Sequence, residues 1–179
     1  AALVGQYRFP RGIHYGGEKM QEEARTLSAI LEAQLSLYSR ALHLDVHTGY
    51  GPRLEMLVVT SEHEARASAD LARAFAYPAV VKATSSEFYR IQGDMIDFAY
   101  TLARERHPDK PFFAASFEYG TIGESLAAEV LSLHIMVLEN QLYHYGAASP
   151  GLADRIRRDF DSLFTPDDPA WRLQAIESA

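Results

Sequence analysis

The sequence contains no cysteine, which excludes several kinds of site at once. Without thiols there is no disulfide framework, no thiolate metal site and no cysteine nucleophile. Any metal ion must therefore be bound by histidine and carboxylate side chains. We expect a cytoplasmic protein, although cysteine-free chains also occur in the periplasm.

Positive charge and long apolar runs are also scarce. The 17 lysine and arginine residues are outnumbered by 24 aspartate and glutamate residues, which gives a formal net charge of -7. Nucleic-acid binding requires clustered cations, and the basic triplet Arg155, Arg157 and Arg158 is offset by neighbouring aspartates. No apolar run approaches the roughly 20 residues that cross a bilayer, and no segment has the pattern of a signal peptide. We therefore expect neither a nucleic-acid nor a membrane partner, and the sequence indicates no oligomeric state.

Length and apolar periodicity predict one α/β domain over residues 1–179. A chain of 179 residues with 47% hydrophobic content can bury one sizeable core. Ser61 and Glu64 resemble a capping box that opens a helix, and the segment 124–145 is apolar around most of its circumference, so it should pack on two sides. The expected strands are 41–46, 54–60 and 112–117, with shorter ones within 78–97, and the expected helices are 18–39, 61–76, 95–106, 124–145, 152–164 and 170–176.

Three ionisable residues, His43, Asp45 and His47, alternate along the first predicted strand and its end. Side chains two residues apart share one face of a strand, but the first and last lie about 13 Å apart, so all three cannot bind one ion. In one interpretation His47, just before a glycine turn, is a metal ligand that Asp45 supports, because carboxylates commonly orient metal-bound imidazoles. In the other, His43 and Asp45 form a partly buried hydrogen-bonded pair and His47 caps the turn.

Glu118 directly follows the compact apolar run 112–117. A carboxylate in such a position is costly to bury unless it is paired or works near a cation, which favours a functional role. The alternative is an exposed strand end at which Glu118 binds nearby backbone amides. With His47, Glu118 suggests part of a hydrolytic metal site, and we expect both side chains to face one cleft at the carboxyl edge of the sheet.

Several segments resemble the zinc carboxypeptidase superfamily. Residues 88–100 contain a tyrosine before a Gly-x-x-Ile-Asp-x-x-Tyr stretch, and the next predicted strand ends in glutamate, which is the order in the later part of such a domain. The segment 44–49 resembles the one that carries the last zinc ligand. Closer still is a branch of uncharacterised bacterial proteins of this superfamily, which shares the Gly-Gln-Tyr, Tyr-Gly-Gly, Asp-x-His-Thr-Gly-x-Gly-Pro and Glu-x-Gly-Thr motifs. The resemblance covers essentially the whole chain.

This resemblance implies a mixed, largely parallel central sheet flanked by helices, and a site with one zinc ion. It makes His47 the zinc ligand, with Asp45 in support, and Glu118 the general base. Tyr89 is implied to contact the substrate. The implied reaction is zinc-dependent hydrolysis of a peptide or small acyl-amino-acid amide bond, as in a metallopeptidase or amidohydrolase.

One departure from the family pattern limits this expectation. The other zinc ligands of the family form a His-x-x-Glu motif, and no histidine in this sequence has glutamate three residues later. One histidine cannot form a three-ligand catalytic site. We therefore expect the chain to be the C-terminal part of a zinc carboxypeptidase-like catalytic domain, inactive alone and with apolar surface left uncovered. The alternatives are a catalytically silent structural or interaction domain with this fold, and a metal-independent hydrolase that uses Asp45 and His47.

Overall fold

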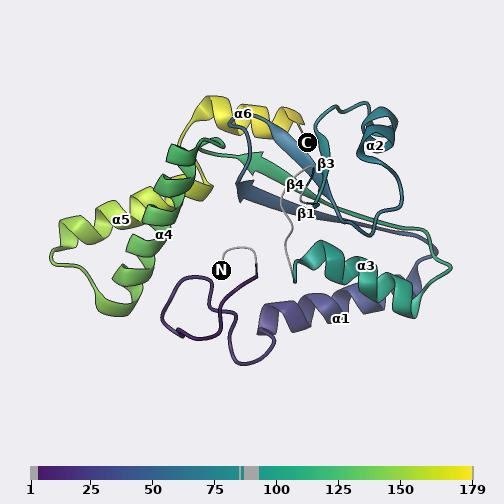
Figure 1. Ribbon diagram of the computed structural model, residues 1–179, viewed down its shortest axis with the longest axis horizontal. Coiled ribbons are helices and arrows are strands. Elements are labelled where there is room, and N and C mark those ends of the chain that lie inside the picture. The colour runs from purple at the N-terminus through teal and green to yellow at the C-terminus, as the bar shows by residue number, and fades with distance from the viewer. Residues whose placement is uncertain (1–3, 85, 87–92, 179) are drawn as a thin grey trace. The chain divides into compact units, whose positions relative to one another are not determined.

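The computed structural model describes residues 4–84, 86 and 93–178. They form an α/β protein in which helices flank a four-stranded mixed sheet with the strand order β1-β4-β2-β3 (Figure 1), so the predicted fold class is confirmed. In chain order the elements are α1 Glu22–Leu37, β1 Ala41–Gly49, β2 Met56–Thr60, α2 Ser68–Phe75, β3 Val80–Lys82, α3 Met95–Arg106, β4 Phe112–Gly120, α4 Leu126–Tyr145, α5 Pro150–Phe164 and α6 Pro169–Ser178.

The chain divides into two compact units. The first unit comprises residues 1–7, 16–46 and 58–117. The second unit comprises residues 8–15, 47–57 and 118–179. Helices α1 to α3 belong to the first unit and helices α4 to α6 to the second, whereas β1, β2 and β4 contribute residues to both. None of the described helices is both long and apolar enough to cross a membrane.

In the first unit, α3 packs one face into a small core. Its buried residues are Ile96, Ala99, Tyr100 and Ala103. This spacing is that of an amphipathic helix with a single apolar stripe. The helix begins after Asp94, whose carboxylate accepts a hydrogen bond of 2.7 Å from the backbone N–H of Asp97. The ring of Tyr100 meets that of Phe112 edge to face, with centroids 5.2 Å apart, which ties α3 to β4.

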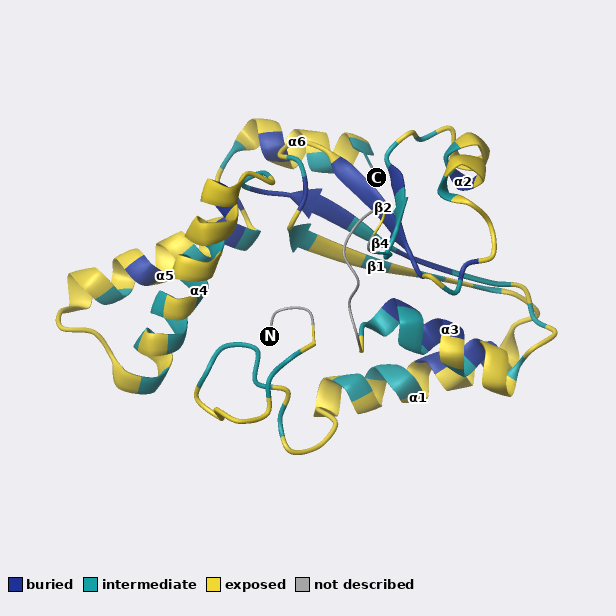
Figure 2. Cartoon of the chain, in the orientation of Figure 1, coloured by how far each residue is buried: buried dark blue, intermediate teal, exposed yellow. Residues whose placement is uncertain are grey.

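Strand β2 is buried along its whole length (Figure 2). It pairs in parallel with β3 through Val58 and Val80, Val59 and Val81, and Thr60 and Lys82. A strand covered on both faces needs a continuous apolar run rather than an alternating one, because neither face meets water. The sequence of β2 meets this requirement.

Strand β1 is formed as predicted, but its burial runs against its hydrophobicity. Leu42 and Val46 are 63% and 66% exposed, whereas His43 and Asp45 on the alternate face are half-buried. The strand order places β1 at one edge of the sheet. The polar face of β1 is therefore the one that the fold covers, and its apolar face is left open.

Helix α2 begins at Ser68, so the predicted helix start at Ser61 is wrong. The carboxylate of Glu64 does not close a capping box. It binds Arg66, with a Nε–Oε1 distance of 2.8 Å, and accepts a hydrogen bond of 2.8 Å from the hydroxyl of Tyr100. The hydrogen bond from Arg66 is the largest influence that lowers the pKa of Glu64, to about 2. A competing side-chain partner therefore delays the helix by seven residues relative to the local sequence signal.

The prediction that α4 packs on two sides is wrong for the described residues. The helix contacts α5, yet Ala128 is its only buried residue. Leu126, Val130, Leu133 and Val137 are all exposed. At 100° per residue these four lie on the face opposite Ala128. Apolar surface is thus uncovered here, as expected, and the same is true of β1.

Candidate functional site

His47 and Glu118, which the sequence predicted to face one cleft, contact each other in the second unit. Near the end of β1, His47 places its Nδ1 atom 3.4 Å from Oε2 of Glu118, which β4 contributes. The side chain of His47 is 48% exposed and that of Glu118 only 10%. The carboxylate is therefore enclosed, while the imidazole stays accessible from solvent.

The carboxylate of Glu118 has a polar contact at each oxygen. While Oε2 faces His47, Oε1 accepts a hydrogen bond of 3.3 Å from the backbone N–H of Tyr50. The alternative of an exposed strand end is wrong because Glu118 is buried, although a backbone amide is one of its partners. A buried carboxylate with two specific partners has a fixed orientation, as a proton-transferring group requires.

The glycine turn after β1 packs directly on the chain beside Glu118. A Cβ atom at Gly120 would lie 2.2 Å from the carbonyl oxygen of Pro52 and 2.3 Å from that of Gly51, so only glycine fits. The hydroxyl of Thr121 donates a 3.0 Å hydrogen bond to the carbonyl of Gly49. The end of β4 and the turn 49–52 are therefore in direct contact at Gly120 and Thr121.

Helix α6 supports the same segment through Trp171. The indole Nε1–H of this buried residue donates a hydrogen bond of 2.8 Å to the carbonyl of Gly120. Arg53, beyond the glycine turn, pairs with Asp168 directly before the helix. The hydrogen bond from Arg53 is the main cause that lowers the pKa of Asp168. Sequence reasoning missed both contacts, since neither partner lies in a motif with the other.

Acidic residues lie around Tyr50. Burial is the largest cause that raises the pKa of its phenol, and the charges of Glu124 and Glu129 raise it further. These two carboxylates lie just before α4 and in its first turn. With Glu118 on the amide of Tyr50, the surroundings of this residue favour cations over anions.

The remaining predicted site residues are Asp45 and Tyr89, and His43 belongs to the same strand as Asp45. Asp45 is half-buried in the first unit, and its charge contributes to raising the pKa of Asp94. Its role behind His47 stays a prediction. Atom Nε2 of His43 is buried without a hydrogen-bond partner in the described part of the chain. Tyr89 lies outside the described residues.

A second group of ionisable side chains lies in the first unit. Glu62, His63 and Asp97 place one ligand atom each within 4.8 Å of one another, a spacing that could hold a metal ion. The hydroxyl of Ser61 bonds to Asp97, and Nη1 of Arg104 is 3.2 Å from Nδ1 of His63. A guanidinium this close opposes a bound cation. The sequence signalled only Asp97, as part of the Gly-x-x-Ile-Asp-x-x-Tyr stretch.

The donor set around His47 is incomplete for a catalytic zinc ion. Imidazole nitrogen and carboxylate oxygen are both suitable zinc donors, but such a site takes three protein ligands. Among the described residues, Glu62, His63 and Asp97 form the only group of three potential ligands, and it includes neither His47 nor Glu118. The residues present thus fit part of a zinc site and not a whole one.

Comparison with known proteins identifies the family. Residues 1–178 match the model of a family described as "Protein of unknown function (DUF2817)". No curated protein and no solved structure matches the chain. The zinc carboxypeptidase resemblance therefore stays a prediction. Because the match spans nearly every residue, the chain belongs to the DUF2817 family.

Proposed function

We propose that His47 and Glu118 are part of the active site of a zinc-dependent metallopeptidase or amidohydrolase of the carboxypeptidase type. The substrate would carry a peptide or small acyl-amino-acid amide bond. The observation that carries the proposal is the 3.4 Å contact between His47 and a buried Glu118, two residues 71 positions apart whose segments both resemble site segments of that superfamily.

Glu118 is the proposed general base. Its Oε1 atom accepts a hydrogen bond from the amide of Tyr50, so Oε2 is the atom that faces His47. A carboxylate there can take the proton from water and return it to the leaving amine. The enclosure of Glu118 limits competing contacts with bulk water, which supports this role.

His47 is the proposed metal ligand. Its half-exposed imidazole presents Nδ1 beside Glu118 and can be reached from solvent. The chemistry that a bound zinc ion supplies in such sites is polarisation of the scissile carbonyl and activation of water. Since His47 alone does not supply the three protein ligands of a catalytic site, the proposal requires donors beyond the described residues.

Hydrolysis by the intact gene product tests the role of Glu118. Glu118→Gln keeps the size of the side chain and its contact with Tyr50, but it cannot accept the proton. We expect cleavage of acyl-amino acids and short peptides to fall about 100-fold or more, with zinc content unchanged. Glu23→Gln, on the exposed side of α1, is the matched control and should keep full activity. Equal rates for the Glu118 and Glu23 variants would refute the assignment.

The uncovered apolar faces of β1 and α4 favour a second candidate, a catalytically silent interaction domain. That candidate predicts an intact gene product without zinc and without hydrolytic activity. Measurements of zinc content and of hydrolysis therefore distinguish the two proposals.

A further inference from the structure

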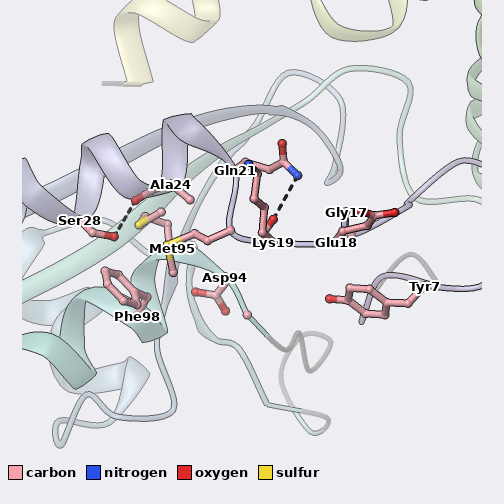
Figure 3. A pocket seen from close by; sticks show the side chains of 13 residues that line it. Tyr7, Gly17, Glu18, Lys19, Gln21, Ala24, Ser28, Asp94, Met95 and Phe98 are labelled. Carbon is pink, nitrogen blue, oxygen red and sulfur yellow. Dashed lines mark hydrogen bonds between the residues drawn. The ribbon is translucent and has the colours of Figure 1, made fainter. Parts of the chain in front are cut away.

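The first unit contains a cavity of about 600 Å³ (Figure 3). It is lined by Tyr7 and by three segments, namely the loop 16–21, the first turns of α1 and the start of α3. Its volume lies within the roughly 300–1,000 Å³ of small-molecule sites. Neither His47 nor Glu118 is among the lining residues.

Apolar side chains from two helices and a loop form much of the cavity wall. Met95 and Phe98 project from α3, and Met20 comes from the loop before α1. The ring of Tyr7 closes against Gly16, where a Cβ atom would lie 2.4 Å from the ring. Methionine side chains adapt to irregular ligands, and an aromatic ring accepts an apolar or a cationic group.

The charged groups of the cavity favour a cation. Among the described lining residues, two are acidic, Glu18 and Asp94, and one is basic, Lys19. Burial raises the pKa of Asp94, and the neighbouring charges of Asp97 and Asp45 act in the same direction. Among the described residues the recorded partners of this carboxylate are backbone amides, with no cation beside it. A cationic ligand group would supply the missing counter-charge.

We propose that this cavity binds a small organic ammonium compound, with its cationic group at Asp94 and its apolar body against Met20, Met95 and Phe98. The cationic group of such a ligand compensates Asp94 for the hydration lost on burial. The apolar body of the ligand covers the apolar side chains of the cavity wall. The proposal does not depend on zinc or on hydrolysis, so its failure and that of the proposed function are distinguishable.

Methyl NMR can test the site directly, because the protein has 4 methionines and two of them line the cavity. With ¹³C-methyl methionine, 4-phenylbutylamine should shift the signals of Met20 and Met95 in a saturable way. Met56 and Met136 lie outside the cavity lining and should not move. The neutral 4-phenylbutanol and the anionic 4-phenylbutyrate should bind at least about tenfold more weakly, since they lose the charged hydrogen bond.

Three substitutions test the proposed binding site. Asp94→Asn retains a good N-cap for α3 but removes the charge, so amine affinity should fall about tenfold, to that of the alcohol. Glu105→Gln removes one charge elsewhere on α3 and should leave binding unchanged. Ala24→Phe, which fills the cavity from α1, should abolish the Met20 and Met95 shifts. Unchanged amine binding in Asp94→Asn would overturn the proposal, as would shifts confined to Met56 and Met136 or no binding at all.

Discussion

The residues that follow Glu118 are closely packed, so few substitutions fit there. Two positions on, Gly120 has the carbonyls of Gly51 and Pro52 where its Cβ would be, and its own carbonyl is bonded to the indole of Trp171. The glycine turn, the strand end and α6 therefore converge on one backbone segment. We expect this segment to be the least tolerant of substitution in the second unit.

Gly120→Ala should reduce the free energy of unfolding by about 3 kcal/mol, because the new methyl group collides with backbone rather than with a movable side chain. Urea denaturation measures the loss. Gly151→Ala is the matched control, since a Cβ there meets nothing within 4 Å. This helical position should change stability by no more than about 1 kcal/mol, and toward greater stability. Similar losses for both variants would contradict the close contact of Gly120 with the carbonyls of Gly51 and Pro52.

Trp171→Phe should keep most of the apolar contact of the indole but leave the carbonyl of Gly120 without its donor. Loss of a buried hydrogen bond of this kind costs about 1–3 kcal/mol. Chemical denaturation followed by circular dichroism gives the value, because Trp171 is the sole tryptophan and fluorescence is lost with it. A cost near zero would mean that the indole contributes only its area.

At the scale of elements, local pattern located most helices and strands but not their environment. The bounds of α3 are those predicted, and the structure shows that its apolar stripe and its Asp94 cap both come from the local sequence. Strands β1 and β4 run three residues further than predicted, through the glycine turns. The partial burial of His43 and Asp45 agrees with one of the two interpretations of this strand, but the local pattern did not decide between them, since burial depends on distant segments.

The interaction of Glu64 with Arg66, just before α2, makes the stability of the protein depend on pH. The pKa of Glu64 is lowered from its ordinary 4.5 to about 2 in the folded protein, chiefly by Arg66. The ionised group therefore stabilises the fold above pH 4.5, and this contribution is lost as the pH falls toward 2. We expect the free energy of unfolding to decrease by roughly 2 kcal/mol over that interval because of Glu64.

Urea titrations at pH 2 to 6 can isolate this contribution. Glu64→Gln should be less stable than the wild type at pH 6 and should lose less stability on acidification. Glu105→Gln, an exposed change on α3, should follow the wild-type curve. Parallel curves for wild type and Glu64→Gln would contradict the assignment.

At the scale of the molecule, the sequence predicted an α/β fold and the meeting of two residues, His47 and Glu118, across 71 positions. It did not reveal the contact of Trp171 with Gly120 or the cavity beside Asp94, because these depend on segments without shared motifs. The proposal of a hydrolytic site rests on the contact between His47 and the buried Glu118.

The zinc content of the intact gene product tests that proposal most directly. Purified without chelators and measured by mass spectrometry, the wild type should contain one zinc ion per chain. His47→Ala should contain none, whereas His63→Ala, which changes the separate group with Glu62 and Asp97, should retain it. A wild-type protein free of zinc, or a His47→Ala variant that keeps it, would contradict the assignment of His47 as a zinc ligand.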